Sequence, residues 1–347
     1  MKIAFTSCCN IKQYPEQNWW NDISDQNPDY LLLLGDNIYM DYPPLIPRVK
    51  KLKRMSADLF GKEMDAMYKR QFEEPNFNKL FNKLKANNAV FGIWDDHDFL
   101  WNDSNGAAVR QEVDKNIIEI DEKLVVSRRL FHHYFQNCTS NFPHLYYSID
   151  TIKARIIFLD TRSYSDKAGE NSELLGKAQL GYLESKLEHD KEYTIICSGQ
   201  TLTEYRFDKL KATAENWAGY PMQLVEFCRL IANKEKTIFL SGDIHCNRFV
   251  EPIALSKIKG ILKPSAVSQA EFDILMTPPQ FISSGFALKL LGFLKNWALL
   301  NFDSSGLSIS FSKRNIKNKN STSIDADVTN QANAWLQANK YYTPANA

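Results

Sequence analysis

The sequence lacks an excess of charge of either sign. Its 347 residues include 42 Lys and Arg against 41 Asp and Glu, which leaves a formal net charge of +1. Proteins that bind nucleic acid over a broad surface usually spread a strong positive field over it, so this balance gives no strong nucleic-acid signal. A phosphate-bearing partner would have to be held by local residues.

Disulfide-type cysteine spacing and long apolar runs are also missing. The six cysteines, at positions 8, 9, 138, 197, 228 and 246, form no CxxC pair and no short-spaced framework, which is typical of a reducing compartment. The longest apolar run, 287–302, is interrupted by two lysines and a glycine and is too short to cross a bilayer. The N-terminal MKIAFTSCC enters a strand-like run at residue 2, without the features of a signal peptide. We therefore expect a cytoplasmic protein with no transmembrane segment.

What the sequence does contain is a series of short apolar runs separated by longer polar stretches. The runs are KIAFTS, YLLLLGD, AVFGIWDD, ARIIFLDTR, YTIICSGQ and KTIFLSGDIH. This alternation predicts an α/β fold. Because the runs are apolar almost throughout, their strands should be covered on both faces.

Side chains capable of chemistry come directly after these runs. They are Cys8, Asp36, Asp96 with His97, Asp160, Gln200, and Asp243 with His245. Ligands of α/β proteins bind at the carboxyl ends of the strands. We therefore expect the six strand ends to converge on one crevice.

The clustering of carboxylates and imidazoles at these ends favours a metal site. A Gly-Asp pair after a strand can be only a turn or a helix cap, but here it occurs in LLLLGD and again in IFLSGDIH, with IWDDHD between them. Ionised groups at the ends of apolar strands are costly unless they are paired or bound to metal. Carboxylate, imidazole and amide ligands from several strands suit a two-metal site for phosphoryl chemistry, with one aspartate bridging the metals.

The ordered set of motifs resembles the alkaline phosphatase D (PhoD-like) branch of the calcineurin-like metallophosphoesterases. The motifs are Ser7-Cys8, Gly35-Asp36-Asn37-Ile38-Tyr39, Trp94-Asp95-Asp96-His97-Asp98, Asp160-Thr161-Arg162, Gly199-Gln200, Trp217-Ala218-Gly219-Tyr220-Pro221 and Gly242-Asp243-Ile244-His245. The resemblance covers roughly residues 2–312, and the combination is specific although no single motif is. It implies a four-layer α/β/β/α sandwich with a binuclear metal centre at the strand ends.

The resemblance also implies a ligand set. It makes Asp36 the bridging aspartate, with Cys8 and Tyr39 as ligands of a ferric ion. Asp243 and His245 complete the shell, Asp96 takes the place of the amide ligand in the commoner GNHD/E motif, and Asn102 is a further candidate. Thiolate and phenolate donors favour Fe³⁺, and the hard oxygen ligands suit a divalent partner such as Ca²⁺, Mg²⁺, Mn²⁺ or Zn²⁺.

Other residues receive roles around this set. His97 is expected to protonate the leaving oxygen after a metal-held hydroxide attacks phosphorus. Arg162 is expected either to bind substrate phosphate or to pair with Asp160 and pin a loop. Asp95 and Gln200 are possible ligands or supporting residues. Cys9 should point away from Cys8 into the core, although each cysteine taken alone could be an ordinary buried thiol.

The rest of the chain divides into a main domain and a tail. We expect a phosphoesterase domain over 1–312 with a basic insert at about 46–88, most easily read as two helices. The insert is either a solvated face, which is favoured, or a phosphate-attracting rim. NFDSSGLSISFS predicts a hairpin. From residue 313 to 347 we expect a polar linker, NIKNKNSTS, and a docked terminal helix within 326–342.

The function expected from these features is hydrolysis of a small-molecule or lipid phosphoric ester, either a monoester or a diester. The alternatives are a metal- or nucleotide-binding module that has lost turnover, and a nuclease or phospholipase on the same scaffold. The presence of His97 weighs against the first. Only the stretch 290–300, with Phe293 and Trp297, suggests a lipid surface, and core is the favoured interpretation.

Overall fold

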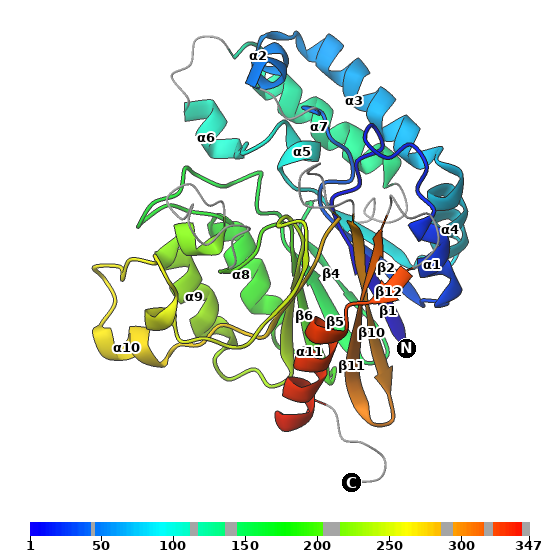
Figure 1. Ribbon diagram of the computed structural model, residues 1–347. Coiled ribbons are helices and arrows are strands. Elements are labelled where there is room, and N and C mark those ends of the chain that lie inside the picture. Colours follow the sequence, from blue (N-terminus) through cyan, green and yellow to red (C-terminus); the bar gives the residue numbers. More distant parts are fainter. Residues whose placement is uncertain are drawn as a thin grey trace.

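The computed structural model describes residues 1–42, 46–111, 117–135, 144–203, 216–285, 294–315 and 322–341. In this part of the chain the strands form two six-stranded sheets that pack face to face, with helices on the two outer faces (Figure 1). The predicted four-layer α/β/β/α sandwich is confirmed.

The first sheet combines the N-terminal strands with a C-terminal hairpin. In spatial order its strands are β12 (Thr322–Ile324), β11 (Gly306–Asn315), β10 (Leu294–Asp303), β1 (Lys2–Thr6), β2 (Tyr30–Leu34) and β3 (Val90–Ile93). Strands β1, β2 and β3 are parallel, and β10 is antiparallel to β1. The carboxyl ends of β1, β2 and β3 therefore lie at one edge of the sheet.

The second sheet is mostly parallel. Its order is β4 (Tyr147–Asp150), β5 (Ala154–Phe158), β6 (Tyr193–Ser198), β7 (Thr237–Ser241), β9 (Gln280–Ser283) and β8 (Asn247–Val250). Only the outer strands β4 and β8 run antiparallel to their neighbours. The six strands expected from the apolar runs are all present, as β1, β2, β3, β5, β6 and β7.

Strand β2 shows why the apolar runs are continuous. Leu31 and Leu33 belong to the core between the first sheet and its helices, whereas Leu32 and Leu34 belong to the core between the two sheets. Successive side chains of a strand point to opposite faces, so a strand buried on both sides needs apolar residues at every position. This double burial makes β2 a rigid support for the aspartate that follows it.

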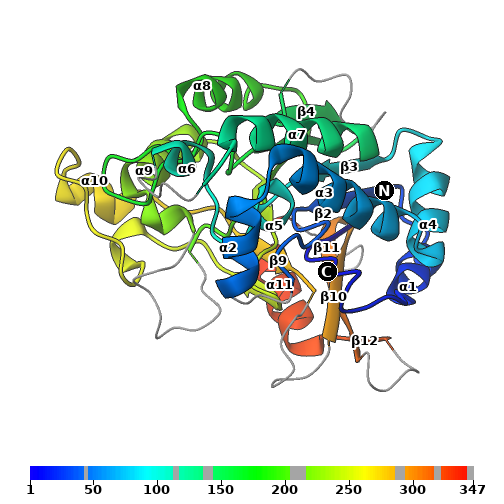
Figure 2. The ribbon, with the colours of Figure 1, turned by 90° about the horizontal axis from the view of Figure 1, so that it is seen from above.

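Helices cover both outer faces. Helices α1 (Trp19–Asp25), α3 (Ala57–Phe72), α4 (Pro75–Lys85) and α7 (Ile120–Tyr134) share a core with the first sheet, and α8 (Lys177–Lys186), α9 (Pro221–Ile231) and α10 (Gln269–Ile274) share one with the second. Figure 2 shows these two groups of helices from above. The short elements are α5 (Asp96–Phe99), α6 (Gly106–Gln111), and the 3₁₀ turns Trp217–Gly219 and Leu255–Lys257. No helix in the described residues is long and apolar enough to cross a membrane.

The basic insert contains three helices rather than the two expected, so that prediction was wrong. Helix α2 (Ile46–Arg54) ends before Ser56, whose side chain accepts a hydrogen bond from the N–H of Leu59 and caps α3. Glu74 caps α4 in the same way, at 2.7 Å from the Phe77 nitrogen, with Pro75 in the first turn. Each cap begins a new helix, so that the segment is divided into three.

The C-terminal part adds to the core instead of only linking to a tail. The predicted hairpin is present, with Asp303 opposite Gly306, and β11 continues to Asn315 where a linker was expected. Helix α11 (Ala326–Ala338) follows β12 and buries Ala332 and Leu336 in the core between the sheets. In the suggested lipid-facing stretch, Trp297 is buried in β10 and Phe293 lies outside the described residues, as do 316–321 of the linker and Tyr342.

Candidate metal centre

Residues that follow β1, β2 and β3 meet at one point. The thiol of Cys8 donates to Asp36 Oδ2 at 3.3 Å, and the hydroxyl of Tyr39 donates to the same oxygen at 3.1 Å. All three side chains are buried. The thiol and the phenol therefore converge on one carboxylate oxygen. The cysteine side chain that faces Asp36 is that of Cys8, not Cys9. Cys9 is packed in the core under the helices, as predicted.

The backbone at this point is strained. Cys8, Asp36, Asp243 and His245 have φ values of +59°, +53°, +65° and +58°. A non-glycine residue in this left-handed region costs on the order of 1–3 kcal/mol and is found where function requires a particular side-chain direction. Four such residues after three different strands indicate that the ends of β1, β2 and β7 are shaped around a common site.

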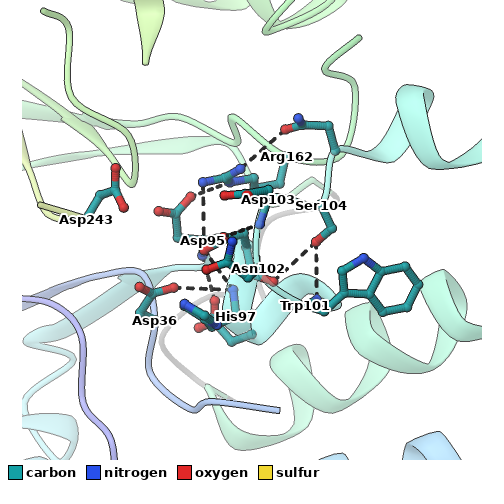
Figure 3. A network of polar contacts seen from close by, with 12 residues as sticks. Asp36, Asp95, His97, Trp101, Asn102, Asp103, Ser104, Arg162 and Asp243 are labelled. Carbon is teal, nitrogen blue, oxygen red and sulfur yellow. Dashed lines mark hydrogen bonds and ion pairs between the residues drawn. The ribbon is translucent and has the colours of Figure 1, made fainter. Parts of the chain in front are cut away.

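Asp96 and His97 join the group from the start of α5. One ligand atom from each of Asp36, Asp96 and His97 lies within 4.8 Å of the other two, and all three residues are buried. The backbone N–H of His97 donates to Asp36 Oδ1 at 3.4 Å, and that of Asp103 donates to Asp96 Oδ2 at 2.7 Å (Figure 3). The short helix thus turns both side chains of the Asp-His pair toward Asp36.

The electrostatics of the group fit a bound cation. Burial and the neighbouring Cys8 raise the pKa of Asp36 well above its usual value, and burial raises the pKa of Cys8 to about 11. Burial, Asp36 and Cys8 together raise the pKa of Tyr39 as well. Three acidic groups crowded away from water resist ionisation unless positive charge lies between them, and a metal ion reverses this preference. The donor set therefore fits a metal.

His97 is held by a carboxylate that the sequence reasoning missed. Its Nδ1 lies 2.6 Å from Asp41 Oδ1, and its ring stacks on Tyr39 with centroids 4.1 Å apart. Burial alone would lower the pKa of His97, but Asp96, Asp36 and Asp41 raise it well above its usual value. Asp41 lies five residues after Asp36 in GDNIYMD. The available signal was a second carboxylate close behind the first, but nothing in the spacing assigned it to His97.

The second sheet contributes Asp243 and His245 after β7. The backbone oxygen of Asp243 lies 3.9 Å from Cys8 Sγ, which brings this segment to the Cys8–Asp36 pair, and Figure 3 includes Asp243 with the network. The Nδ1 of His245 lies 2.6 Å from the carbonyl oxygen of Gly285. That oxygen can only accept, so Nδ1 carries the proton and Nε2 is the nitrogen with the lone pair, as in many metal-binding histidines.

Arg162 lies beneath this group and is completely buried. Its Nε donates to Asp95 Oδ1, and its Nη2 lies 3.8 Å from Asp96 Oδ1. Of the two roles expected for Arg162, the contact with Asp160 is made by its backbone: Asp160 accepts the N–H of Arg162 at 3.0 Å and the indole N–H of Trp94 at 2.8 Å. Asp160 thus shapes the loop, while Arg162 orients Asp95.

The two weaker candidates differ in position. Gln200, after β6, is completely buried, and neither atom of its amide has a hydrogen-bond partner within the described residues. A buried amide of this kind needs a partner such as an ion or ligand. Asn102 is exposed and donates its backbone N–H to Asp41 Oδ2 at 2.8 Å. Its backbone therefore supports the His97–Asp41 pair.

Comparison with solved structures found a similar fold in PhoD. A solved structure of PhoD matches with a TM-score of 0.59 at 17% identity, covering 91% of this chain and 69% of that one. A putative 5'-nucleotidase from Staphylococcus aureus matches at 12% identity, 97% and 59% coverage and a TM-score of 0.40. A Thermus thermophilus protein matches at 10% identity, 93% and 98% coverage and a TM-score of 0.38. A comparison with curated proteins gave no match.

The family match, with a candidate metal-binding group in the site, supports a metal-dependent phosphoesterase. Residues 3–265 match the family described as PhoD-like phosphatase, which is most of the chain. The chain belongs to the PhoD-like phosphatase family, as its motifs suggested.

Proposed function

We propose that this protein hydrolyses phosphoric monoesters or diesters at a binuclear metal centre. The observation that carries the proposal is the meeting of Cys8 and Tyr39 on one oxygen of Asp36, with Asp96 and His97 adjacent. One oxygen of Asp36 accepts the backbone N–H of His97, whereas both partners of the other oxygen are themselves potential anionic ligands.

The residues divide into two ligand groups. Cys8 and Tyr39 would hold a ferric ion, with Asp36 shared between the two metals. Asp96 and Gln200 offer the oxygen donors that suit a divalent ion such as Ca²⁺, Mg²⁺, Mn²⁺ or Zn²⁺. Asp243 and His245 complete the set, and Asn102 remains a candidate. When bound, such ions lower the pKa of water to generate a nucleophile and neutralise charge on the phosphoryl group.

His97 and Arg162 would serve the reaction in different ways. Asp41 accepts from Nδ1 of His97, which fixes the ring so that Nε2 can present a proton to the leaving oxygen. Arg162 holds Asp95 in place, and its guanidinium would add positive charge close to Asp96. Because Arg162 is completely buried, it would attract substrate phosphate through this charge and not through direct contact.

Assays with two chromogenic substrates test the proposal. The protein, purified without chelators, should hydrolyse p-nitrophenyl phosphate, bis-p-nitrophenyl phosphate or both, and Asp36→Asn should lower kcat at least about 10²-fold because the shared ligand is lost. Asp58→Asn serves as the control, since Asp58 is exposed and its ion-pair partner among the described residues is Lys62. Absence of turnover with every metal supplement would favour the alternative of a metal- or nucleotide-binding module.

A further inference from the structure

A buried lysine stands directly behind the first ligand of the site. Lys295, in β10, is only 1% exposed. Its Nζ donates to the carbonyl oxygen of Ser7 at 2.6 Å and to that of Cys8 at 3.3 Å, and it lies 3.7 Å from the sulfur of Cys9. No carboxylate in the described part of the chain forms an ion pair with it. Burying an ammonium group without one is costly, so these contacts must matter to the fold or to the site.

Gly285, which follows β9 in the second sheet, lies against Lys295 Nζ and the carbonyl oxygens of Ser7 and Cys8. The N–H of Gly285 donates to the Ser7 oxygen at 3.1 Å, so this carbonyl accepts both the glycine and the lysine. A Cβ at position 285 would lie 2.4 Å from Lys295 Nζ and 2.8 Å from the Cys8 oxygen. Only glycine leaves room for the ammonium group to reach these two carbonyls.

Gly285 also contacts His245, the proposed ligand from the second sheet. Its carbonyl oxygen accepts the proton of His245 Nδ1 at 2.6 Å. Cys8 and His245 both have left-handed backbone conformations, with φ of +59° and +58°. Two strained residues from opposite sheets are therefore held through one cluster, which we call the Lys295 bracket: Ser7, Cys8, His245, Gly285 and Lys295.

We propose that Lys295 is a positioning residue that fixes Cys8 and His245 in the geometry needed to bind metal. Its ammonium group donates to the carbonyl oxygens of Ser7 and Cys8, on either side of the Cys8 N–Cα bond, and this keeps the thiol directed at Asp36. Its bond to the Ser7 oxygen also supports the contact between Ser7 and Gly285, and Gly285 in turn orients the ring of His245. The inference rests on the proposed function, since it takes Cys8 and His245 as ligands. The bracket preassembles the centre, and its loss should weaken metal binding more than folding.

The chain offers a matched control for this lysine. Lys123, in α7, is also buried, and its Nζ donates to the carbonyl oxygens of Lys53 and Ile118 at 2.9 and 2.8 Å. It therefore makes the same kind of contact without touching the bracket. Lys295→Met and Lys123→Met each remove a buried ammonium group capped by two carbonyls, so they should have similar structural costs.

The test is titration of the chelator-treated full-length protein with Co²⁺, followed by the thiolate-to-cobalt absorption band. Circular dichroism checks the fold of each variant. We expect Lys295→Met to bind Co²⁺ about 10–100-fold more weakly, with a diminished thiolate band, and Lys123→Met to match the wild type. Gly285→Ala should give the same loss as Lys295→Met and replaces it if that variant does not fold.

The outcomes separate this inference from the function it rests on. A wild-type protein that shows no thiolate–cobalt band would refute the assignment of Cys8 as a ligand, whatever the variants do. A normal band in the wild type and an unchanged affinity in Lys295→Met would overturn the role of Lys295 alone. Equal losses in Lys295→Met and Lys123→Met would also overturn it, because they would show a general effect of removing a buried charge.

Discussion

At the scale of single residues, the site depends on how a few side chains are directed. Asp36 could have been a turn residue, and Cys8 an ordinary core thiol. Their shared hydrogen bond, and the phenol of Tyr39 on the same oxygen of Asp36, distinguish them from such residues, and both also have a strained left-handed backbone. The strain costs free energy that packing elsewhere must offset, which is typical of residues retained for function.

The pairing of His97 with Asp41 predicts a pH dependence. Asp41 helps to raise the pKa of His97, so the protonated acid persists to higher pH and is lost as pH rises through that raised value. Asp41→Asn should therefore move the alkaline limb of the kcat–pH profile to lower pH, by about one unit or more. An alkaline limb that stays in place while kcat falls would show that Asp41 does not act through the protonation of His97. Asp58→Asn should leave the profile unchanged.

The sequence named most residues of this candidate site but not their supporting contacts. Cys8, Asp36, Asp96, His97, Asp243 and His245 could be found because each follows an apolar strand. Asp41 and Lys295 could not, because each acts through a contact made by the folded chain. Lys295 in particular looked like a charge that interrupts an apolar run, and only the proximity of β10 to β1 shows why that charge is buried.

At the scale of elements, the strands were predictable and the helix boundaries less so. Continuous apolar runs identify doubly buried strands, because both faces must be covered. The basic and amphipathic insert was most easily read as two helices, whereas Ser56 and Glu74 each cap the start of a helix and the segment holds three. A single capping residue is a weaker signal of a helix boundary in the sequence than a long amphipathic pattern is of a helix.

The insert borders the site through its first helix. Arg48 Nε donates to the carbonyl oxygen of Met40 at 3.1 Å, and Lys53 Nζ lies 5.8 Å from the centre of the Trp101 ring. Figures 1 and 2 together place α2 over α5. Lys50, Lys51 and Arg54 are exposed on this helix. Whether they form a solvated face or attract phosphate stays a prediction.

Helix α11 should contribute to stability despite its position after a polar stretch. Leu336 is completely buried in the core between the sheets, so Leu336→Ala should lower the free energy of unfolding by about 2–5 kcal/mol. Leu262, which is 76% exposed, gives the control, and Leu262→Ala should stay within about 0.5 kcal/mol of the wild type. Urea unfolding followed by tryptophan fluorescence measures both. Equal stability of the two variants would mean that α11 is only loosely docked.

At the scale of the whole molecule, the two sheets bring together candidate ligands far apart in the sequence. Cys8, Asp36, Asp96 and His97 come from the first sheet, and Asp243 and His245 from the second. Parallel strands end at the same edge, which is why the convergence could be predicted before the structure was known. The order of strands and the pairing of β10 with β1 depend on long-range contacts that no local pattern specifies.

The central claim is that Cys8 is a ligand in a metal centre of a phosphoesterase. The most direct test is elemental analysis of the wild type, Cys8→Ala and Cys9→Ala, each purified without chelators or a metal-binding tag. The two cysteines are adjacent and both buried, so Cys9→Ala controls for the loss of a core thiol. We expect iron and a divalent metal in the wild type and in Cys9→Ala, and loss of iron in Cys8→Ala. Equal iron in all three proteins, or no metal in the wild type, would contradict it.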